Sequence, residues 1–236
     1  MYRQRRYDEC IKEVKSKLKQ NPTSLHLLNY QAMAYSALKR DGEALESYQK
    51  IIKKDPILAG PHYNMGIILK RNGREEEAID CYKKAISLKS DYVQAYNNLG
   101  VLYKDKEEFA SATAMFIKAK ELQPDHQNSY YNLALIKKEQ GLNEQAIGLL
   151  LKVLDLNPQH SGAKYDMAII KKDLGRLEES KRYLQDILKS NKENANAAIS
   201  LANVFIEIGK YHAAINSLRH IIKVSSKNRT LVHHLG

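Results

Sequence analysis

The sequence predicts an all-α fold, a right-handed α-solenoid of stacked antiparallel helix pairs with a period of about 34 residues. Two series of small residues, one series of aromatic or leucine residues, and four of the five prolines all recur with this period. The members are Cys10, Ala44, Ala78, Ala112, Ala146, Ser180 and Ala214; Ala32, Gly66, Gly100, Ala134, Ala168, Ala202 and Gly236; Tyr48, Tyr82, Phe116, Leu150, Leu184 and Leu218; and Pro22, Pro56, Pro124 and Pro158.

Each series has a physical reason. Alanine and glycine allow two helices to cross closely, and the aromatic and leucine side chains fill the space beside them. Proline follows each second helix because it cannot continue one. Glycines between the two helices of a pair also share the register, and glycine tolerates the left-handed conformation that ends a helix. These glycines are Gly73, Gly141, Gly175 and Gly209.

The period divides the chain into repeats, each expected to be two amphipathic helices of about 12–14 residues. Residues 1–24 fit the second helix of a partial first repeat, and residues 25–228 form six full repeats in one solenoid. These six are 25–58, 59–92, 93–126, 127–160, 161–194 and 195–228, and residues 229–236 begin a further, truncated repeat. One helix pair cannot bury its apolar face alone, so neighbouring pairs must stack.

The third full repeat carries a family resemblance. Its residues Tyr96-Asn97-Asn98-Leu99-Gly100, followed by Tyr103, Ala112, Phe116, Ala119 and Pro124, resemble the consensus of the tetratricopeptide repeat (TPR) family. The resemblance extends over nearly the whole chain and implies a protein-binding scaffold rather than an enzyme. Some positions depart from the family pattern: His62, Lys164 and Ala198 replace a large aromatic residue, Gln31 replaces a core leucine, and Lys192 and Ser226 replace proline.

In this family the first helix of each pair lines a concave groove that binds a peptide. Carried over position by position, the resemblance implies a peptide-binding groove with four rows of side chains. The rows are Asn64, Asn98, Asn132 and Asp166; Lys70, Lys104, Lys138 and Lys172; Ile67, Val101, Leu135 and Ile169; and Tyr63, Tyr131 and Tyr165. The asparagine row resembles the asparagine ladder in the repeat domain of O-GlcNAc transferases.

The chemistry of these rows suits an extended peptide. An amide side chain both donates and accepts hydrogen bonds, so it can hold a peptide backbone. Lysines favour acidic side chains on that peptide, and tyrosines supply rigid contact area. Two alternatives stay open: the aliphatic row could belong to the core, and the lysines could pair with the chain's own Asp105, Glu139, Asp173 and Glu207. The carboxylate clamp of the chaperone-binding members is absent, because its positions hold Tyr63, Ile67, Asn97 and Val101.

The formal net charge of +11 is concentrated at the two ends of the chain. Residues 1–24 carry seven Lys or Arg against three Asp or Glu, and residues 195–236 carry five against one, so each end has a net charge of +4. This charge suits an acidic partner or nucleic acid. A nucleic-acid-associated helical-repeat protein is therefore the alternative function, although the groove shows no residue code that varies from repeat to repeat.

Motifs for enzymatic or metal chemistry are missing from the sequence. It has no phosphate-binding glycine loop with its lysine, no GxSxG and no HExxH, and Cys10 and Cys81 form no CxxC pair. We therefore expect no catalysis, cofactor or metal. No apolar stretch is long enough to span a bilayer, and no apolar signal core follows the charged N-terminus, so we expect a cytoplasmic or other intracellular protein.

The two ends of the solenoid are expected to be interaction surfaces. Leu231, Val232 and Leu235 have no following helix to cover them, and the helix with Tyr7, Cys10, Ile11 and Val14 lacks its first-helix partner. Uncovered apolar surface of this kind marks an interaction patch. The chain is therefore expected to be part of a longer protein, or a subunit whose ends dock on other components.

Overall fold

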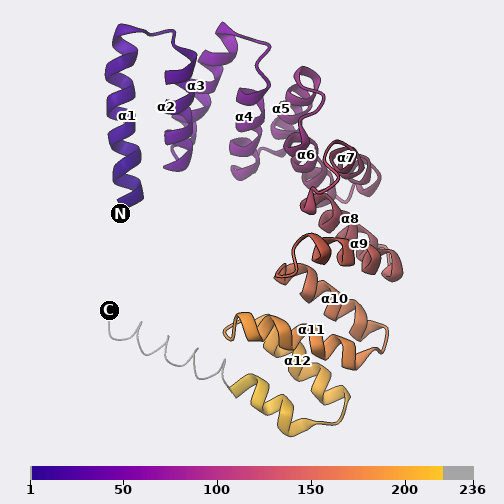
Figure 1. Cartoon of the computed structure of the whole chain (residues 1–236). Helices are drawn as coiled ribbons and strands as arrows, with labels where there is room; N and C mark the ends of the chain where they lie inside the picture. Colours follow the sequence, from indigo (N-terminus) through magenta and orange to yellow (C-terminus); the bar gives the residue numbers. More distant parts are fainter. Residues whose placement is uncertain (1, 220–236) are drawn as a thin grey trace. The chain divides into compact units, whose positions relative to one another are not determined.

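The computed structural model describes the backbone of residues 2–219 and the side chains of residues 6–219. The chain forms two compact parts, Met1–Pro124 and Asp125–Gly236, called here the N-terminal and the C-terminal part. Each part is a stack of helices joined by short turns (Figure 1). The described residues 2–219 contain helices and no strands, which confirms the predicted all-α fold class.

Seven helices make up the N-terminal part. They are α1 (Tyr2–Gln20), α2 (Leu25–Ala37), α3 (Asp41–Lys54), α4 (Ala59–Arg71), α5 (Glu75–Leu88), α6 (Val93–Asp105) and α7 (Phe109–Leu122). The C-terminal part contains α8 (Gln127–Glu139), α9 (Asn143–Leu156), α10 (Ser161–Asp173), α11 (Leu177–Ser190) and α12 (Ala195–Glu207). Residues 211–219 are helical as well. The even-numbered helices from α2 onward begin one sequence period apart, and they are the first helices of the expected pairs.

The helix ends follow from local chemistry. Gly73, Gly141, Gly175 and Gly209 all have positive φ angles, between 72° and 79°, as predicted for the turn inside each pair. The same register position holds Lys39 and Glu107, with φ angles of 57° and 61°. A side chain is strained in this conformation, so these two repeats do not have the residue that suits their backbone. The prolines Pro22, Pro56, Pro124 and Pro158 each stand two residues after the end of a second helix.

The close helix crossings lie where the small residues predict them. A Cβ atom added to Gly66 would lie 2.6 Å from Cε1 of Tyr82, and one added to Gly100 would lie 2.7 Å from Cε1 of Phe116. Real Cβ atoms do not approach so closely, so a larger residue at either position would displace the aromatic ring packed on it. The alanines Ala44, Ala78, Ala112 and Ala146 are fully buried at the matching positions of the second helices.

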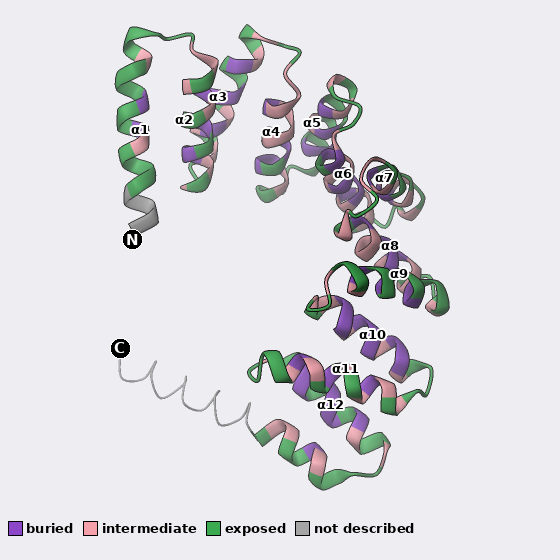
Figure 2. Ribbon diagram, viewed as in Figure 1, coloured by how far each residue is buried: buried purple, intermediate pink, exposed green. Residues whose placement is uncertain are grey.

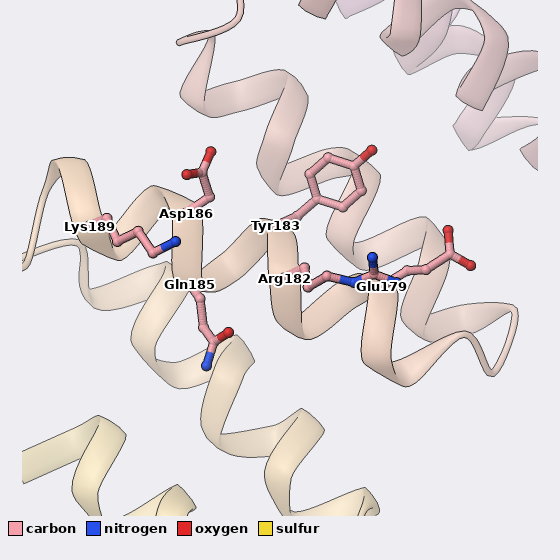
Figure 3. Close-up of a pocket in the computed structure, with 6 residues that line it drawn as sticks. All are labelled: Glu179, Arg182, Tyr183, Gln185, Asp186 and Lys189. Carbon is pink, nitrogen blue, oxygen red and sulfur yellow. The ribbon is translucent and has the colours of Figure 1, made fainter.

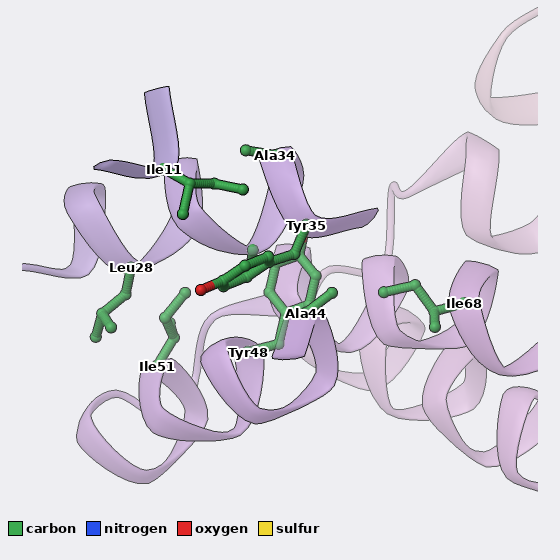
Figure 4. Close-up of a cluster of buried hydrophobic side chains, with 9 residues drawn as sticks. Ile11, Leu28, Ala34, Tyr35, Ala44, Tyr48, Ile51 and Ile68 are labelled. Carbon is green, nitrogen blue, oxygen red and sulfur yellow. The ribbon is translucent and has the colours of Figure 1, made fainter. Parts of the chain in front are cut away.

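Each part has a continuous apolar core along its helix stack (Figure 2). In the N-terminal part, one cluster joins α1, α2, α3 and α4 around Tyr35 and Tyr48 (Figure 4). In the C-terminal part, a cluster around Leu150 and Met167 joins α8, α9 and α10. These clusters fix the angle between successive pairs within each part, and so they fix which faces of the first helices remain accessible.

Two of the polar replacements, Gln31 and Lys164, are paired in the core. Gln31 is buried, and its Oε1 accepts a hydrogen bond from the hydroxyl of Ser47 at 3.3 Å. Lys164 is also buried, and its ammonium group is bound to Asp186 on α11. Asp186 stands at a register position that holds lysine in the four preceding repeats, at Lys50, Lys84, Lys118 and Lys152. The lysine that enters the core is therefore matched by a carboxylate that replaces a lysine.

The expectation for the N-terminal helix is wrong in part. Ile11 and Val14 are only 4% and 6% exposed, because α2 packs against α1 and covers them. Tyr7 is 40% exposed and Cys10 is partly buried, so the uncovered apolar surface on α1 is smaller than the sequence indicated. The corresponding C-terminal residues Leu231, Val232 and Leu235 lie outside the described residues.

Candidate functional site

The site residues implied by the sequence all lie on first helices. Those on α4 and α6 belong to the N-terminal part: Tyr63, Asn64, Ile67, Lys70, Asn98, Val101 and Lys104. Those on α8 and α10 belong to the C-terminal part: Tyr131, Asn132, Leu135, Lys138, Tyr165, Asp166, Ile169 and Lys172. Nearly all of these side chains are partly exposed. We call the surface formed by these residues in each part the first-helix face of that part.

Asparagines and tyrosines form a bonded row on the N-terminal part. Nδ2 of Asn98 on α6 donates a hydrogen bond to the hydroxyl oxygen of Tyr63 on α4 at 3.2 Å. The buried Tyr82 lies near Asn98 and the buried Tyr48 near Asn64, and after the larger effect of burial each amide influences the pKa of its tyrosine. Burial raises the pKa of Tyr48 to about 12, and the amide of Asn64 opposes this rise.

These bonds change the interpretation of the asparagine row. The sequence indicated solvent-facing amides, but Asn64 and Asn98 are half-buried, and Asn98 is bonded to the hydroxyl of Tyr63. An amide has two donor hydrogens and an oxygen with two acceptor sites, so capacity for a ligand remains. Asn98 therefore links α6 to α4 and presents its remaining amide atoms at the surface.

On the C-terminal part, Asp166 takes the place of asparagine. Its carboxylate is only 7% exposed, and Oδ2 accepts a hydrogen bond from the Tyr131 hydroxyl at 2.7 Å. Lys138 on α8 forms an ion pair with the other oxygen, Oδ1. Burial, and then the bond to Asp166, raise the pKa of Tyr131. One step further along the stack, Tyr165 and Ser200 of α12 share a hydrogen bond of 3.1 Å between their hydroxyl oxygens.

All four lysines of the predicted site form ion pairs within the chain. Lys70, on α4, and Lys104, the neighbour of Asp105 on α6, each have Nζ 3.2 Å from the Asp105 carboxylate. Lys172 lies 3.3 Å from Glu207, and Lys138 binds Asp166. Each ammonium group therefore faces a carboxylate of the protein itself, and the first-helix faces offer less positive charge to a ligand than the sequence suggests.

Exposed apolar side chains also lie on the first helices, both in the predicted aliphatic row and beside it. Ile67 is 37% exposed, whereas Val101, Leu135 and Ile169 are partly buried. Two further residues on α2, Tyr30 and Met33, are 58% and 52% exposed. Met33 occupies the register position of Ile67 one repeat earlier, so the register could have placed it in the aliphatic row. On α12, the exposed Ile206 occupies the register position of Lys172 one repeat later, so the predicted row of lysines does not include it.

A small pocket lies away from these faces, among α3, α4 and α5. Its volume is about 250 Å³, and it is lined by Leu45, Gln49, Met65, Leu69, Arg74, Glu77, Asp80 and Cys81. Burial, together with the neighbouring Asp80 and Glu77, raises the pKa of the Cys81 thiol. A thiol of this kind stays protonated near neutral pH and is a poor nucleophile. The described part of the chain contains no group of three or more His, Cys, Asp or Glu side chains that could hold a metal ion.

No helix in the described residues is both long enough and apolar enough to cross a membrane.

Antiparallel helix pairs that recur with one constant sequence period, and that pack on one another within each part, define a helical-repeat protein. Family models described as TPR repeat or tetratricopeptide repeat match residues 30–56, 72–106, 93–126, 138–204 and 195–228. The chain is therefore a tetratricopeptide repeat protein, which confirms the family indicated by the sequence. The narrower resemblance to the asparagine ladder of O-GlcNAc transferases stays a prediction.

Solved structures share this fold. The chain is 26% identical to MamA, with a TM-score of 0.60, and the match covers 64% of this chain and 89% of MamA. It is 22% identical to YrrB, described as a TPR protein with an unusual peptide-binding site, with a TM-score of 0.63 and coverage of 81% and 98%. It is 17% identical to PilF of Pseudomonas aeruginosa, with a TM-score of 0.73 and coverage of 92% and 93%. None of the curated proteins matches the sequence.

Proposed function

We propose that this protein is an interaction scaffold that binds an extended segment of a protein partner along its first-helix faces. The repeat fold supports the general role, because TPR proteins are scaffolds for protein–protein interaction. Stacked repeats build long surfaces from neighbouring helices, and these surfaces suit an elongated ligand. The proposal includes the division of residues 25–228 into six tetratricopeptide repeats.

One observation carries the proposal: the partly exposed tyrosines of the first helices are bonded to polar side chains of the next first helix. Tyr63 to Asn98, Tyr131 to Asp166 and Tyr165 to Ser200 all join residues 35 positions apart. A side chain that is already held in place loses less conformational entropy when a ligand binds. The faces therefore offer fixed amide and hydroxyl groups along the direction in which the helices of each part stack.

The chemistry of the faces suits a peptide backbone. A peptide in extended conformation has unpaired N–H and C=O groups, which need both donors and acceptors. Amide and hydroxyl groups supply both. Exposed apolar residues such as Met33 and Ile67 can contact side chains of the same segment. A structurally similar protein, YrrB, is described as having a peptide-binding site, which agrees with this use of the fold.

The test begins with a peptide selected on the full chain from a random display library, and its affinity is measured by titration calorimetry. The informative variant is Met33→Asp combined with Ile67→Asp, because both side chains are more than a third exposed and their change should not unfold the protein. We expect at least a tenfold loss of affinity. Burying an unpaired carboxylate against an apolar ligand is unfavourable.

The matched control is Ile57→Asp combined with Ile117→Asp. These residues are also exposed isoleucines of the N-terminal part, but they lie in the turn before α4 and on the second helix α7. The control changes the net charge by the same amount and should bind as the unchanged protein does. Equal weakening of both variants would reject the site. Tight, salt-sensitive binding of RNA without any peptide binding would favour the nucleic-acid alternative.

A further inference from the structure

The outer side of α11 carries an open pocket with a volume of about 530 Å³ (Figure 3). Within the described residues, its lining comes entirely from this helix: Glu179, Arg182, Tyr183, Gln185, Asp186 and Lys189. Four of these six side chains are charged, with two of each sign. The pocket lies on a second helix, so it is separate from the first-helix face of the C-terminal part.

The two carboxylates of the pocket are already neutralised by lysines from α10. Lys171 Nζ lies 2.9 Å from Glu179, and Lys164 is bound to Asp186. Both lysine side chains are at most 10% exposed, and a buried lysine is stable only when it is paired. The two lysines of α10 therefore neutralise both carboxylates of the pocket.

The two cations of the pocket have no such ion-pair partners among the described residues. Arg182 and Lys189 are exposed and form no ion pair within the described part of the chain, although Arg182 lies near enough to Glu179 to lower its pKa slightly. Tyr183 lies between them in sequence, and its ring is partly exposed. After the internal pairs are counted, the pocket presents two positive charges beside an aromatic ring.

A pair of cations at these positions is absent from the two preceding repeats. The positions of Arg182 and Lys189 hold Gly148 and Asp155 in the preceding repeat, and Ala114 and Glu121 in the one before it. Cations at both positions also occur on α1, at Lys12 and Lys19, but there Glu13 takes the place of Tyr183. Exposed residues that vary in this way from repeat to repeat are not needed for the fold. The inverted charges on α11 therefore require another explanation.

We propose that the α11 pocket is a second docking site, which binds an acidic peptide segment. Arg182 and Lys189 are seven residues apart on one helix, a rise of about 10.5 Å. A polyproline II chain rises about 3.1 Å per residue and brings every third side chain to the same side, so two carboxylates three residues apart span about 9.3 Å. A segment with an acid-x-x-acid pattern then matches both cations, and its central residues contact Tyr183.

The test uses fluorescein-labelled synthetic peptides and the full chain, with binding followed by fluorescence anisotropy at low salt. The probe carries Glu-Pro-Pro-Glu between glycines, and two comparison peptides carry Gln-Pro-Pro-Gln and Glu-Glu-Pro-Pro. We expect the probe to bind at least fivefold more tightly than either comparison peptide. The variant Arg182→Gln with Lys189→Gln should lose this preference without unfolding, because both side chains are exposed.

A charge-matched control removes two lysines elsewhere. Lys12→Gln with Lys53→Gln lowers the net charge equally, and both residues are exposed on α1 and α3 of the N-terminal part. This control should bind the probe as the unchanged protein does. The proposal is overturned if the glutamine peptide binds equally well, if the control loses as much affinity as the α11 variant, or if single-stranded RNA displaces the probe and binds α11 more tightly.

Discussion

The hydroxyl of Tyr131 on α8 donates a hydrogen bond to the Asp166 carboxylate on α10, with 2.7 Å between the two oxygens. This bond joins two successive first helices at a buried carboxylate that Lys138 also contacts. It therefore contributes both to the stacking of the repeats and to the position of the groups on the first-helix face.

Removing this bond should destabilise the C-terminal part. The change Tyr131→Phe keeps the ring but leaves one oxygen of the buried carboxylate without its donor. A hydrogen bond to a charged group contributes about 1.5–3 kcal/mol, so the unfolding free energy in urea should fall within that range. The control Tyr211→Phe alters a tyrosine that is 64% exposed, and it should change stability little. Equal stability of both variants would contradict the role given to Tyr131.

The ion pair between buried Lys164 and half-exposed Asp186 gives a second prediction. Asp186→Lys alone leaves a buried ammonium group without its partner and adds a like charge, so it should cost about 3 kcal/mol or more. The double variant Lys164→Tyr with Asp186→Lys installs the residues of the preceding repeat, Tyr130 and Lys152. It should recover most of the loss in urea unfolding. A double variant no more stable than Asp186→Lys would show that the pair is not the reason for the two departures.

Backbone strain at Glu107 gives a third prediction. Its φ angle is 61°, whereas Gly141 holds the same register position at 72°. Glu107→Gly should stabilise the protein by about 0.5–1 kcal/mol, since the relief of left-handed strain exceeds the extra entropy of glycine in the unfolded chain. Gly141→Ala is the reverse exchange and should destabilise it by about 1 kcal/mol. Thermal melts of both variants test this, and shifts of the same sign would be inconsistent with it.

His62 makes stability depend on pH. Its Nε2 atom is buried without a hydrogen-bond partner, and burial, followed by the charge of Lys84, lowers the pKa below the ordinary value of 6.5. The unfolded chain then takes up a proton at a higher pH than the folded protein. Stability is therefore unaffected above about pH 7 and falls as the pH drops through 6.5 towards the lowered pKa.

Urea unfolding at pH 7.5, 6.5 and 5.5 measures this effect. The variant His62→Tyr carries the residue found in the next two repeats, Tyr96 and Tyr130, and should lose less stability over this range than the unchanged protein. Because His126 also has a lowered pKa, some pH dependence should remain in the variant. Identical pH profiles for the two proteins would exclude His62 as a source of the effect.

Periodicity explains why the fold could be predicted from the sequence. The packing of Gly66 on Tyr82 and of Gly100 on Phe116 leaves a small residue and an aromatic residue in fixed register, and both are visible in a single sequence. The sequence did not predict that α2 covers Ile11 and Val14, because the prediction took into account only the first helix that would precede α1.

The candidate site was less predictable, because its pairings join residues 35 positions apart, one more than the period that aligns the rows. The sequence places Tyr63 and Asn98 in separate rows, while the structure bonds them to each other. Similarly, the ion pairs of Lys70 and Lys172 depend on which carboxylates the stacking brings near, and the register left that open. The α11 pocket could have been found by asking why Asp186 replaces a lysine, but the register alone does not show a pocket.

Photo-crosslinking tests the central claim most directly. A peptide selected on the full chain carries a photoreactive phenylalanine at its centre, and mass spectrometry identifies the residues to which it attaches. The account predicts attachment to the first helices, at or beside residues such as Tyr30, Met33, Ile67 and Val101. Attachment confined to the second helices α3, α5 and α7 would contradict it, because the ligand would then lie on the opposite side of the helix pairs.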